Sequence, residues 1–389
     1  MRLRSFGPKL LCALLLFLPI STLSFAQTEN NATIDCSGAT PGAFVSIQQA
    51  LLNSPDHTIF TLSGNCTENL VNIARRTDLS FFANSPVTIQ VTSPDQQVLI
   101  ISRSQNITFS GPITMTGGQG VLISGSNGIV LSQVTIQNSG QFGLTTSNSQ
   151  VQVFNGSITA STRTGVVSFG GTVELDGVTI SNNGRIGVSA ATTHLIMSDG
   201  NGLPPIVSNN GIAGIQLFNS SQGDFTDLQI NNNAGGNFGL MAFNNSAVVI
   251  QGGSINSNTG TGVICVSTSH CEFSQTQINS NTGGGIRTAT HSELELDGAV
   301  QVSGNNGAGI LIDQHSAYTS NGGNTISNNA GDALIVNALS TLNLVAPDTI
   351  TATGANLALN CNNGSLVTGD ISALKNKKCG TQFQAIPIH

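Results

Sequence analysis

Three histidines recur in similar surroundings in the second half of the chain. His270, His291 and His315 stand in the segments TSHCE, ATHSE and DQHSA, and Glu272 and Glu293 follow the first two by two residues. In an extended segment, residues two apart point to the same side. Imidazole with carboxylate is a ligand set for a transition metal ion and a pair for acid–base chemistry. Aligned on the histidines, the three segments would stack His270, His291 and His315 in one column, ~5 Å apart. Either use requires elements that bring these segments together.

A repeat supplies such elements. From residue 120 onward, a Gly followed by an apolar residue returns every 22 to 27 residues, at Gly120, Gly143, Gly165, Gly187, Gly214, Gly239, Gly262, Gly285 and Gly309. Short alternating runs stand between clusters of Gly, Asn and Ser, which is typical of strands and turns without a helix. Such a unit cannot form a core alone. We therefore expect a parallel β-solenoid whose successive strands lie ~4.8 Å apart.

Composition and turn chemistry agree with this expectation. Charged residues make up 8% of the 389 residues, against roughly 25% in ordinary domains, which excludes a helix-rich fold. In a solenoid each residue lies beside its equivalent, so a repeated charge would repel itself. The ISNNG, INNNAGG and INSNTG segments fit turns, because Asn and Gly tolerate positive φ. Stacked Asn side chains can also hydrogen-bond to their equivalents in the next coil.

The repeat resembles the right-handed parallel β-helix family, the scaffold of pectate-lyase-like proteins, over residues 96–355. The resemblance implies an all-β fold, a single right-handed parallel β-helix of about ten to twelve coils. Residues 27–95 resemble the entry segment of such proteins, with first strands and a short amphipathic helix capping the core (Phe44, Ile47, Ala50, Leu51). Residues 356–389 form the other cap, where Lys375, Lys377 and Lys378 are interpreted as a solvated, edge-blocking cluster.

Enzymes on this scaffold commonly place catalytic groups on the outer face of one parallel sheet. Outward positions after each repeat Gly are mostly apolar here. β-Helix lyases are known for an arginine base beside acidic calcium ligands, and only Arg287 and Asp313 match, one coil apart, where a surface ion pair is the alternative. The NTD, DD, GHG and RIK motifs of polygalacturonase-like enzymes are missing. The QDT and GRPW motifs of pectin esterases are missing too.

Two further surfaces are candidates for binding. Phe218, Met241 and Phe243 would form an exposed apolar strip, which marks a partner surface or lies under a local loop. The chain has no Trp and one Tyr, so protein contact is favoured there over sugar stacking. Glu174, Asp224, Glu272 and Glu295 align in an acidic column, although alignment on the histidines places Glu293 opposite Glu272 instead. No resident cofactor is predicted; the residues allow calcium or a transition metal, with a solvated face as the alternative.

The termini and cysteines indicate export. Residues 1–26 read as a secretory signal peptide, and no later segment approaches the ~20 apolar residues of a membrane span. Removal of this signal peptide leaves 9 Lys and Arg residues against 19 Asp and Glu residues. This balance argues against nucleic acid as a partner. The six remaining cysteines allow fifteen pairings, and sequence neighbourhood favours Cys36–Cys66, Cys265–Cys271 and Cys361–Cys379.

These observations predict a secreted protein, extracellular or periplasmic, that acts as a non-catalytic binding or surface-structural module. Its partner would be an extracellular protein or a polysaccharide. The alternative is a polysaccharide lyase or glycoside hydrolase with a divergent active site. The long repeat unit around Asp199–Pro205 is where we expect function to gather, because it departs from its neighbours.

Overall fold

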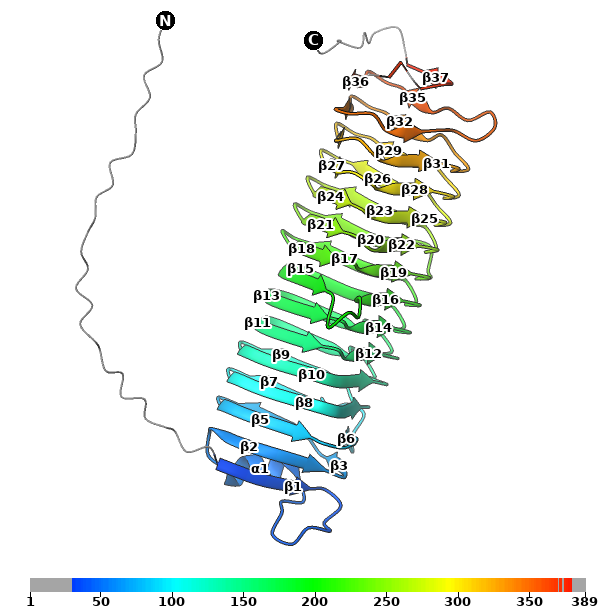
Figure 1. The fold of residues 1–389 in the computed structure, drawn as a ribbon. Helices are drawn as coiled ribbons and strands as arrows, with labels where there is room; N and C mark the ends of the chain where they lie inside the picture. The colour runs from blue at the N-terminus through cyan, green and yellow to red at the C-terminus, as the bar shows by residue number, and fades with distance from the viewer. Residues whose placement is uncertain (1–29, 370, 373, 380–389) are drawn as a thin grey trace, which may run out of the picture.

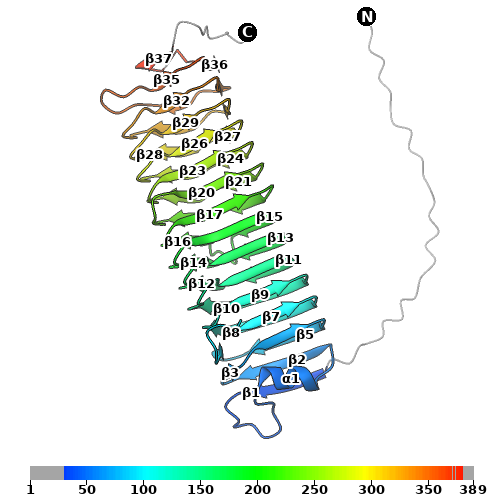
Figure 2. The same ribbon diagram turned by 180° about the vertical axis from the view of Figure 1, so that it is seen from behind.

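The computed structural model describes residues 30–369, 371–372 and 374–379. The predicted signal peptide and residues 380–389 of the predicted C-terminal cap lie outside this range. The chain winds into one long parallel β-solenoid of about 14 coils (Figures 1 and 2). The all-β prediction is confirmed. The coil count is higher than the expected ten to twelve because residues 58–95, assigned to the cap, already contribute paired strands.

Each coil contributes strands to three stacks. The first stack follows the repeat Gly and holds β4 (Val71–Ala74), β7 (Leu99–Ser102), β9 (Val121–Ser124), the starts of β11 (Leu144–Phe154), β13 (Val166–Asp176) and β15 (Ile186–Ser198), then β17 (Ala213–Phe218), β20 (Phe238–Phe243), β23 (Thr261–Val266), β26 (Ile286–Ala289), β29 (Ile310–Ile312), β32 (Leu334–Val336), β35 (Leu359–Cys361) and β37 (Lys377–Lys378).

The second stack begins with β1 (Asn30–Asp35), β2 (Thr58–Ser63), β5 (Thr77–Ala83) and the starts of β8 (Gln105–Thr116) and β10 (Asn127–Gln137). It continues through the ends of β11, β13 and β15 to β18 (Gln222–Thr226), β21 (Ala247–Gln251), β24 (His270–Ser274), β27 (Glu293–Leu296), β30 (Ala317–Ser320), β33 (Thr341–Leu344) and β36 (Leu366–Gly369).

The third stack holds β3 (Asn65–Glu68), β6 (Val87–Val91), the ends of β8 and β10, β12 (Ser157–Thr159), β14 (Thr179–Ser181), β16 (Ile206–Ser208), β19 (Gln229–Asn231), β22 (Ser254–Asn256), β25 (Gln277–Asn279), β28 (Gln301–Ser303), β31 (Thr325–Ser327) and β34 (Thr349–Ile350). Residues at one register position in successive coils form what we call a column.

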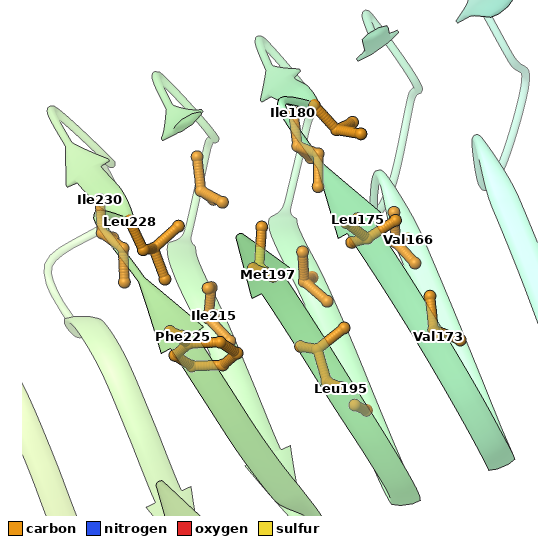
Figure 3. Packing of buried hydrophobic residues seen from close by; sticks show 14 of the residues in the cluster. Val166, Val173, Leu175, Ile180, Leu195, Met197, Ile215, Phe225, Leu228 and Ile230 are labelled. Atoms are coloured by element: carbon orange, nitrogen blue, oxygen red, sulfur yellow. The ribbon is translucent and has the colours of Figure 1, made fainter. Parts of the chain in front are cut away.

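Alternation along each strand buries one side chain in two, and equivalent buried side chains lie on one another. Leu195 pairs with Val173 in the coil before it, and Met197 pairs with Leu175 in the coil before it and with Phe225 in the coil after it. Figure 3 shows these residues pointing into the core from strands of the second stack. In the first coils the core rings of Phe60, Phe81 and Phe109 stack at centroid distances of 4.8 and 4.4 Å. The core is thus continuous along the axis.

A buried ladder of asparagines crosses seven coils and explains the Asn-rich turns. Its members are Asn183, Asn210, Asn233, Asn258, Asn281, Asn305 and Asn329, each at most 1% exposed. From Asn210 onward, each Oδ1 accepts hydrogen bonds from the backbone N–H and the Nδ2 of the preceding member, and the Oδ1 of Asn183 accepts from the backbone N–H of Ser161. In paired motifs the first Asn, such as Asn182 or Asn232, takes positive φ and the second joins the ladder. The prediction that stacked Asn side chains bond between coils is confirmed.

The same ladder accounts for the repeat Gly. A Cβ on Gly262 would lie 2.7 Å from Asn281 Nδ2, 2.8 Å from Ile278 Cγ2 and 2.8 Å from the carbonyl oxygen of Gly285. Gly165 and Gly239 meet equivalent atoms at similar distances. No side chain fits where the backbone passes between the ladder and the core.

The N-terminal end is covered by α1 (Ile47–Asn53), as expected. Ser46 caps the helix by accepting from the Gln49 N–H, and Ile47, Ala50 and Leu51 are buried. Phe44, expected on the helix, precedes it and pairs with Ile34. Glu68 accepts from the Ile47 N–H at 2.5 Å and so ties the helix to β3.

All three predicted disulfides form: Cys36–Cys66, Cys265–Cys271 and Cys361–Cys379. Cys265 and Cys271 are fully buried, so the second bridge crosses the core between β23 and β24 of one coil. Within the described chain, no helix is long and apolar enough to cross a membrane.

Candidate functional site

The outer surface of the second stack carries the acidic groups. From β13 to β27, its outward positions hold six carboxylates and two histidines and include no Lys or Arg: Glu174, Asp176, His194, Asp224, His270, Glu272, Glu293 and Glu295. Parallel pairing fixes their columns, because side chains at matched positions of neighbouring strands point the same way. They gather in two clusters, one on β24 and β27 and one on β13, β15 and β18.

The first cluster, named here the His270 cluster, contains His270, Glu272, Glu293 and Glu295. His270 pairs with Glu293 and Glu272 with Glu295. His270 Nδ1 lies 3.4 Å from Glu293 Oε2, and its Nε2 lies 3.9 Å from Glu272 Oε2. One ligand atom each of His270, Glu272 and Glu295 lies within 4.8 Å of the others. The register therefore matches Glu272 with Glu295, as the acidic column predicted, and not with Glu293.

The prediction that three histidines stack in one column is wrong for His270. His291 and His315 do stack, with ring centroids 5.1 Å apart and planes 5° apart. Both sit in the turn before the second-stack strand, at φ of 59° and 61°. His270 lies two positions further along, as the first residue of β24. Aligning the segments on their histidines ignored that His270 lies two residues farther from its repeat Gly than His291 and His315 lie from theirs.

The second cluster, named here the Asp176 cluster, contains Glu174, Asp176, His194 and Asp224. His194 Nε2 lies 2.6 Å from Asp224 Oδ2 in the next coil. Gln152 donates to Glu174 Oε2 at 2.6 Å, and Ser198 donates to Asp176 Oδ1. Burial raises the pKa of Asp176, the Ser198 hydrogen bond opposes this, and the neighbouring Glu174 raises the pKa further. The His194–Asp224 pair does not contact Asp176: His194 is aligned with Thr172, and Ile196 stands between Glu174 and Asp224 in their column. A carboxyl group held toward its protonated form and a His–Asp pair are each suited to acid–base chemistry.

The long repeat unit lies beside this cluster. Residues 199–205 form the connection between β15 and β16, where Gly200 and Leu203 exchange backbone hydrogen bonds of 3.0 and 3.2 Å. A Cβ on Gly200 would lie 2.7 Å from the carbonyl oxygen of Asp176. The insertion thus packs on the strand end that carries Asp176. Sequence reasoning singled out the insertion but missed Asp176 and His194. The ELDG segment, which occurs at 174–177 and again at 295–298, was the available signal.

The catalytic candidates Arg287 and Asp313 do not form a pair. Arg287 pairs with Leu311, and Asp313 lies two positions after Leu311, directly beyond the end of β29. Asp313 Oδ1 accepts from the backbone N–H of Gln314 at 3.0 Å. Among the described side chains, Arg287 has no ion-pair partner within 4.0 Å. Arginine-base chemistry beside an acidic group is therefore not assembled here.

The apolar strip of Phe218, Met241 and Phe243 lies on the outer face of the first stack. Phe218 pairs with Phe243 and Gln216 with Met241. The two rings are stacked, with centroids 5.5 Å apart. All three side chains are half-buried. Stacking turns one face of each ring toward its neighbour, which leaves less of it for a sugar. Phe169, in the same column two coils earlier than Phe218, is 49% exposed and extends the strip.

The outer face of the third stack is polar and uncharged, a surface that sequence reasoning missed. From β3 to β31 its outward residues are Asn, Thr, Ser and Gln, with Ile206 as the exception: Asn65, Thr67, Thr88, Gln90, Thr114, Thr116, Thr135, Gln137, Ser157, Thr159, Thr179, Ser181, Ser208, Gln229, Asn231, Ser254, Asn256, Gln277, Asn279, Gln301, Ser303, Thr325 and Ser327. We call this surface the polar face. The sequence pattern that could have revealed the polar face is the repeated x-Ile-x or x-Val-x tripeptide, in which x is polar.

Comparison with known proteins supports the fold. Residues 171–330 match the family model described as right handed beta helix region. No curated protein matches the sequence. Among solved structures, the chain is similar to the A-module of the Azotobacter vinelandii mannuronan C-5 epimerase AlgE4. The two share 12% identity, a TM-score of 0.54, and coverage of 86% of this chain and 94% of that one.

Two further solved structures are similar at lower scores. Pectate lyase Pel9A has 12% identity and a TM-score of 0.42, covering 79% of this chain and 80% of that one. The periplasmic alginate epimerase AlgG has 12% identity and a TM-score of 0.44, covering 84% and 83%. With the three parallel stacks and the family match, the fold is established: the chain is a right-handed parallel β-helix.

Proposed function

We propose that this protein is an exported, non-catalytic binding module whose ligand is a neutral polysaccharide lying along the polar face. The observation that carries the proposal is the series of hydroxyl and amide side chains from β3 to β31, in which Ile206 is the one exception. Such groups both donate and accept hydrogen bonds, as sugar hydroxyls do. Three disulfides support an oxidising compartment outside the cytosol.

The polar face is already ordered by contacts between coils. Gln90 Nε2 donates to Thr67 Oγ1 at 2.9 Å, and Ser157 Oγ donates to Thr135 Oγ1 at 3.1 Å. Asn279 Oδ1 accepts from the N–H and the hydroxyl of Ser303, at 2.9 and 3.0 Å. Side chains held in place lose less conformational entropy when a ligand binds. A long, repetitive ligand would meet a repetitive and preorganised surface.

The distribution of charged residues on the surface favours a neutral ligand over an acidic one. The polar face offers no cation to pair with a uronate carboxylate, and the second stack is acidic. An acidic polymer would therefore gain no ion pair on the polar face and would be repelled by the neighbouring one.

Sedimentation with insoluble neutral glycans (cellulose, chitin and β-1,3-glucan) tests this function, with alginate and polygalacturonate compared by affinity electrophoresis. The double variant Gln277→Glu/Gln301→Glu places two like charges at paired positions of the polar face. We expect it to lower affinity for the bound neutral glycan at least tenfold. Gln251→Glu on the second stack is the matched control and should bind like the unmodified protein. Absence of binding to every neutral glycan, or equal loss in the control, would reject the proposal.

A polysaccharide lyase or glycoside hydrolase is the second candidate, favoured by the Asp176 cluster. In this function Asp176 would donate a proton to the glycosidic oxygen, and the His194–Asp224 pair would be a second acid–base group further along the same face. Incubation with pectin, alginate and glycosaminoglycans, followed through unsaturated or reducing ends, tests it. Turnover that is lost in both Asp176→Asn and His194→Gln would support catalysis. No turnover on the full panel would leave the binding function as the better account.

A further inference from the structure

The His270 cluster is independent of the polar face, since it projects from the second stack. His270, Glu272 and Glu295 offer one nitrogen and two carboxylate oxygens within 4.8 Å of one another. Each side chain is half-buried, so an ion can reach the ligand atoms from solvent. The donors come from two adjacent strands of a continuous sheet. Their Cα positions are therefore fixed by the parallel register of β24 and β27.

The remaining neighbours orient these donors. Glu293 Oε2 lies 3.4 Å from His270 Nδ1, and an N–H donated there leaves Nε2 as the free ligand atom, 3.9 Å from Glu272 Oε2. Asn321, from the coil beyond, donates to Glu295 Oε1 at 2.8 Å. Glu295 can still present its other oxygen. Carboxylate-oriented imidazole and hydrogen-bonded carboxylates are the usual surroundings of metal ligands.

Charge gives an independent reason for a cation. Glu272 and Glu295 are directly paired, an arrangement of like charges that destabilises a sheet. Glu293 adds a third carboxylate. The flanking outward positions in the coils before and after are Ala247, Val249, Ala317 and Thr319, none of which is basic. A divalent ion would offset two of the three negative charges.

We propose that His270, Glu272 and Glu295 form a binding site for a divalent transition-metal ion, with Glu293 and Asn321 as positioning residues. An imidazole nitrogen with two carboxylate oxygens suits zinc-like ions, and three protein ligands leave a coordination position for water. Donors at ~2.1 Å from one tetrahedral ion lie about 3.4 Å apart. Rotation of the Glu side chains therefore suffices to close the site.

Isothermal titration of Zn²⁺ into the full-length, disulfide-bonded, untagged protein, pre-treated with chelator, tests the proposal. We expect one ion per chain. His270→Ala and Glu295→Gln should each lower the affinity at least tenfold, and Glu293→Gln should lower it less while keeping the stoichiometry. His291→Ala and His315→Ala are matched controls, because that stacked pair lies outside the cluster, and they should bind as the unmodified protein does.

Circular dichroism and metal-free thermal unfolding show that each variant is folded. A Co²⁺ absorption spectrum in the visible gives a second readout, which His270→Ala should abolish. No Zn²⁺ binding by the unmodified protein would overturn the site. Unchanged affinity in His270→Ala, or loss in the His291 and His315 controls, would do so as well. Preference for Ca²⁺ that does not depend on His270 would equally contradict it.

Discussion

Asn258 and Asn281, in consecutive coils, share a buried hydrogen bond of 3.1 Å from Nδ2 to Oδ1. Asn258 also donates to the Ile230 carbonyl oxygen at 2.9 Å and accepts from Asn233. The side chain is fully buried and uses both its donors and its acceptor. The coils are therefore joined by side-chain bonds in the interior as well as by the strands.

Replacing Asn258 by Ala should strongly destabilise the solenoid. The change leaves the backbone N–H and Nδ2 of Asn233 and the Ile230 carbonyl without this partner in the interior, at roughly 1–3 kcal/mol for each unsatisfied group. We expect the free energy of unfolding to fall by at least about 3 kcal/mol, measured by chemical denaturation. Asn72→Ala, at an exposed strand position, is the control and should change it by less than about 0.5 kcal/mol. Similar losses in both variants would contradict the role of the ladder.

Thr288 presents the opposite case, a buried hydroxyl without a partner. It lies in the core between Cys265 and Ile312, and its Oγ1 makes no hydrogen bond with the described residues. Thr288→Val keeps the shape and removes the unpaired group, so stability should rise by about 1 kcal/mol. Thr319→Val, on an outward position, should be close to neutral. A lower melting temperature for Thr288→Val would show that the hydroxyl is satisfied after all.

The raised pKa of Asp176 predicts a pH-dependent stability. Burial and then Glu174 favour the protonated form in the folded state. The stabilising contribution is therefore present below the unfolded pKa of about 3.9 and is lost as pH rises through the folded value.

Asp176→Asn removes this dependence while keeping an acceptor for Ser198. Its melting temperature should match that of the unmodified protein near pH 4 and exceed it at pH 7. Asp297→Asn, in the second ELDG segment and exposed, serves as the control. An advantage for Asp176→Asn that shrinks as pH rises would reverse the assigned direction.

The disulfides should differ in their contribution. Cys36–Cys66 spans 30 residues and Cys265–Cys271 spans 6. Chain entropy predicts about 4 kcal/mol for the first loop and about 2 kcal/mol for the second. Denaturation of the two double-Ala variants measures both values, and a greater loss for the short bridge would show that core packing outweighs loop closure. Cys361–Cys379 serves as a third case of intermediate loop length, 18 residues.

The fold was predictable because its determinants repeat. Gly262 and its equivalents recur since the ladder leaves no room for a side chain, so spacing alone revealed the coils. The first coils escaped detection because residues 58–95 lack that Gly, and their core is filled instead by large residues such as Phe60 and Phe81. The disulfide pairing followed from neighbourhood, since sequence separation within a coil limits which cysteines can meet.

The candidate sites were less predictable because they depend on register at single-residue precision. His270 was assigned to the column of His291, yet two residues separate their positions, and its true neighbour is Glu293. Gly200 of the insertion packs against the backbone of Asp176, a contact that no periodicity describes. The polar face was overlooked because each of its residues is a common surface residue. Only their alignment in columns along the solenoid is unusual.

The asparagine ladder also has a direction. Each member donates to the Oδ1 of the member that follows it in sequence, from Asn183 to Asn329, and nowhere along this run is the order reversed. A coil is therefore completed by its successor. A chain that emerges N-terminus first would hold its newest coil with unanswered interior amides until the next coil is laid down. The ladder thus makes each of these coils depend on the following coil for its interior hydrogen bonds.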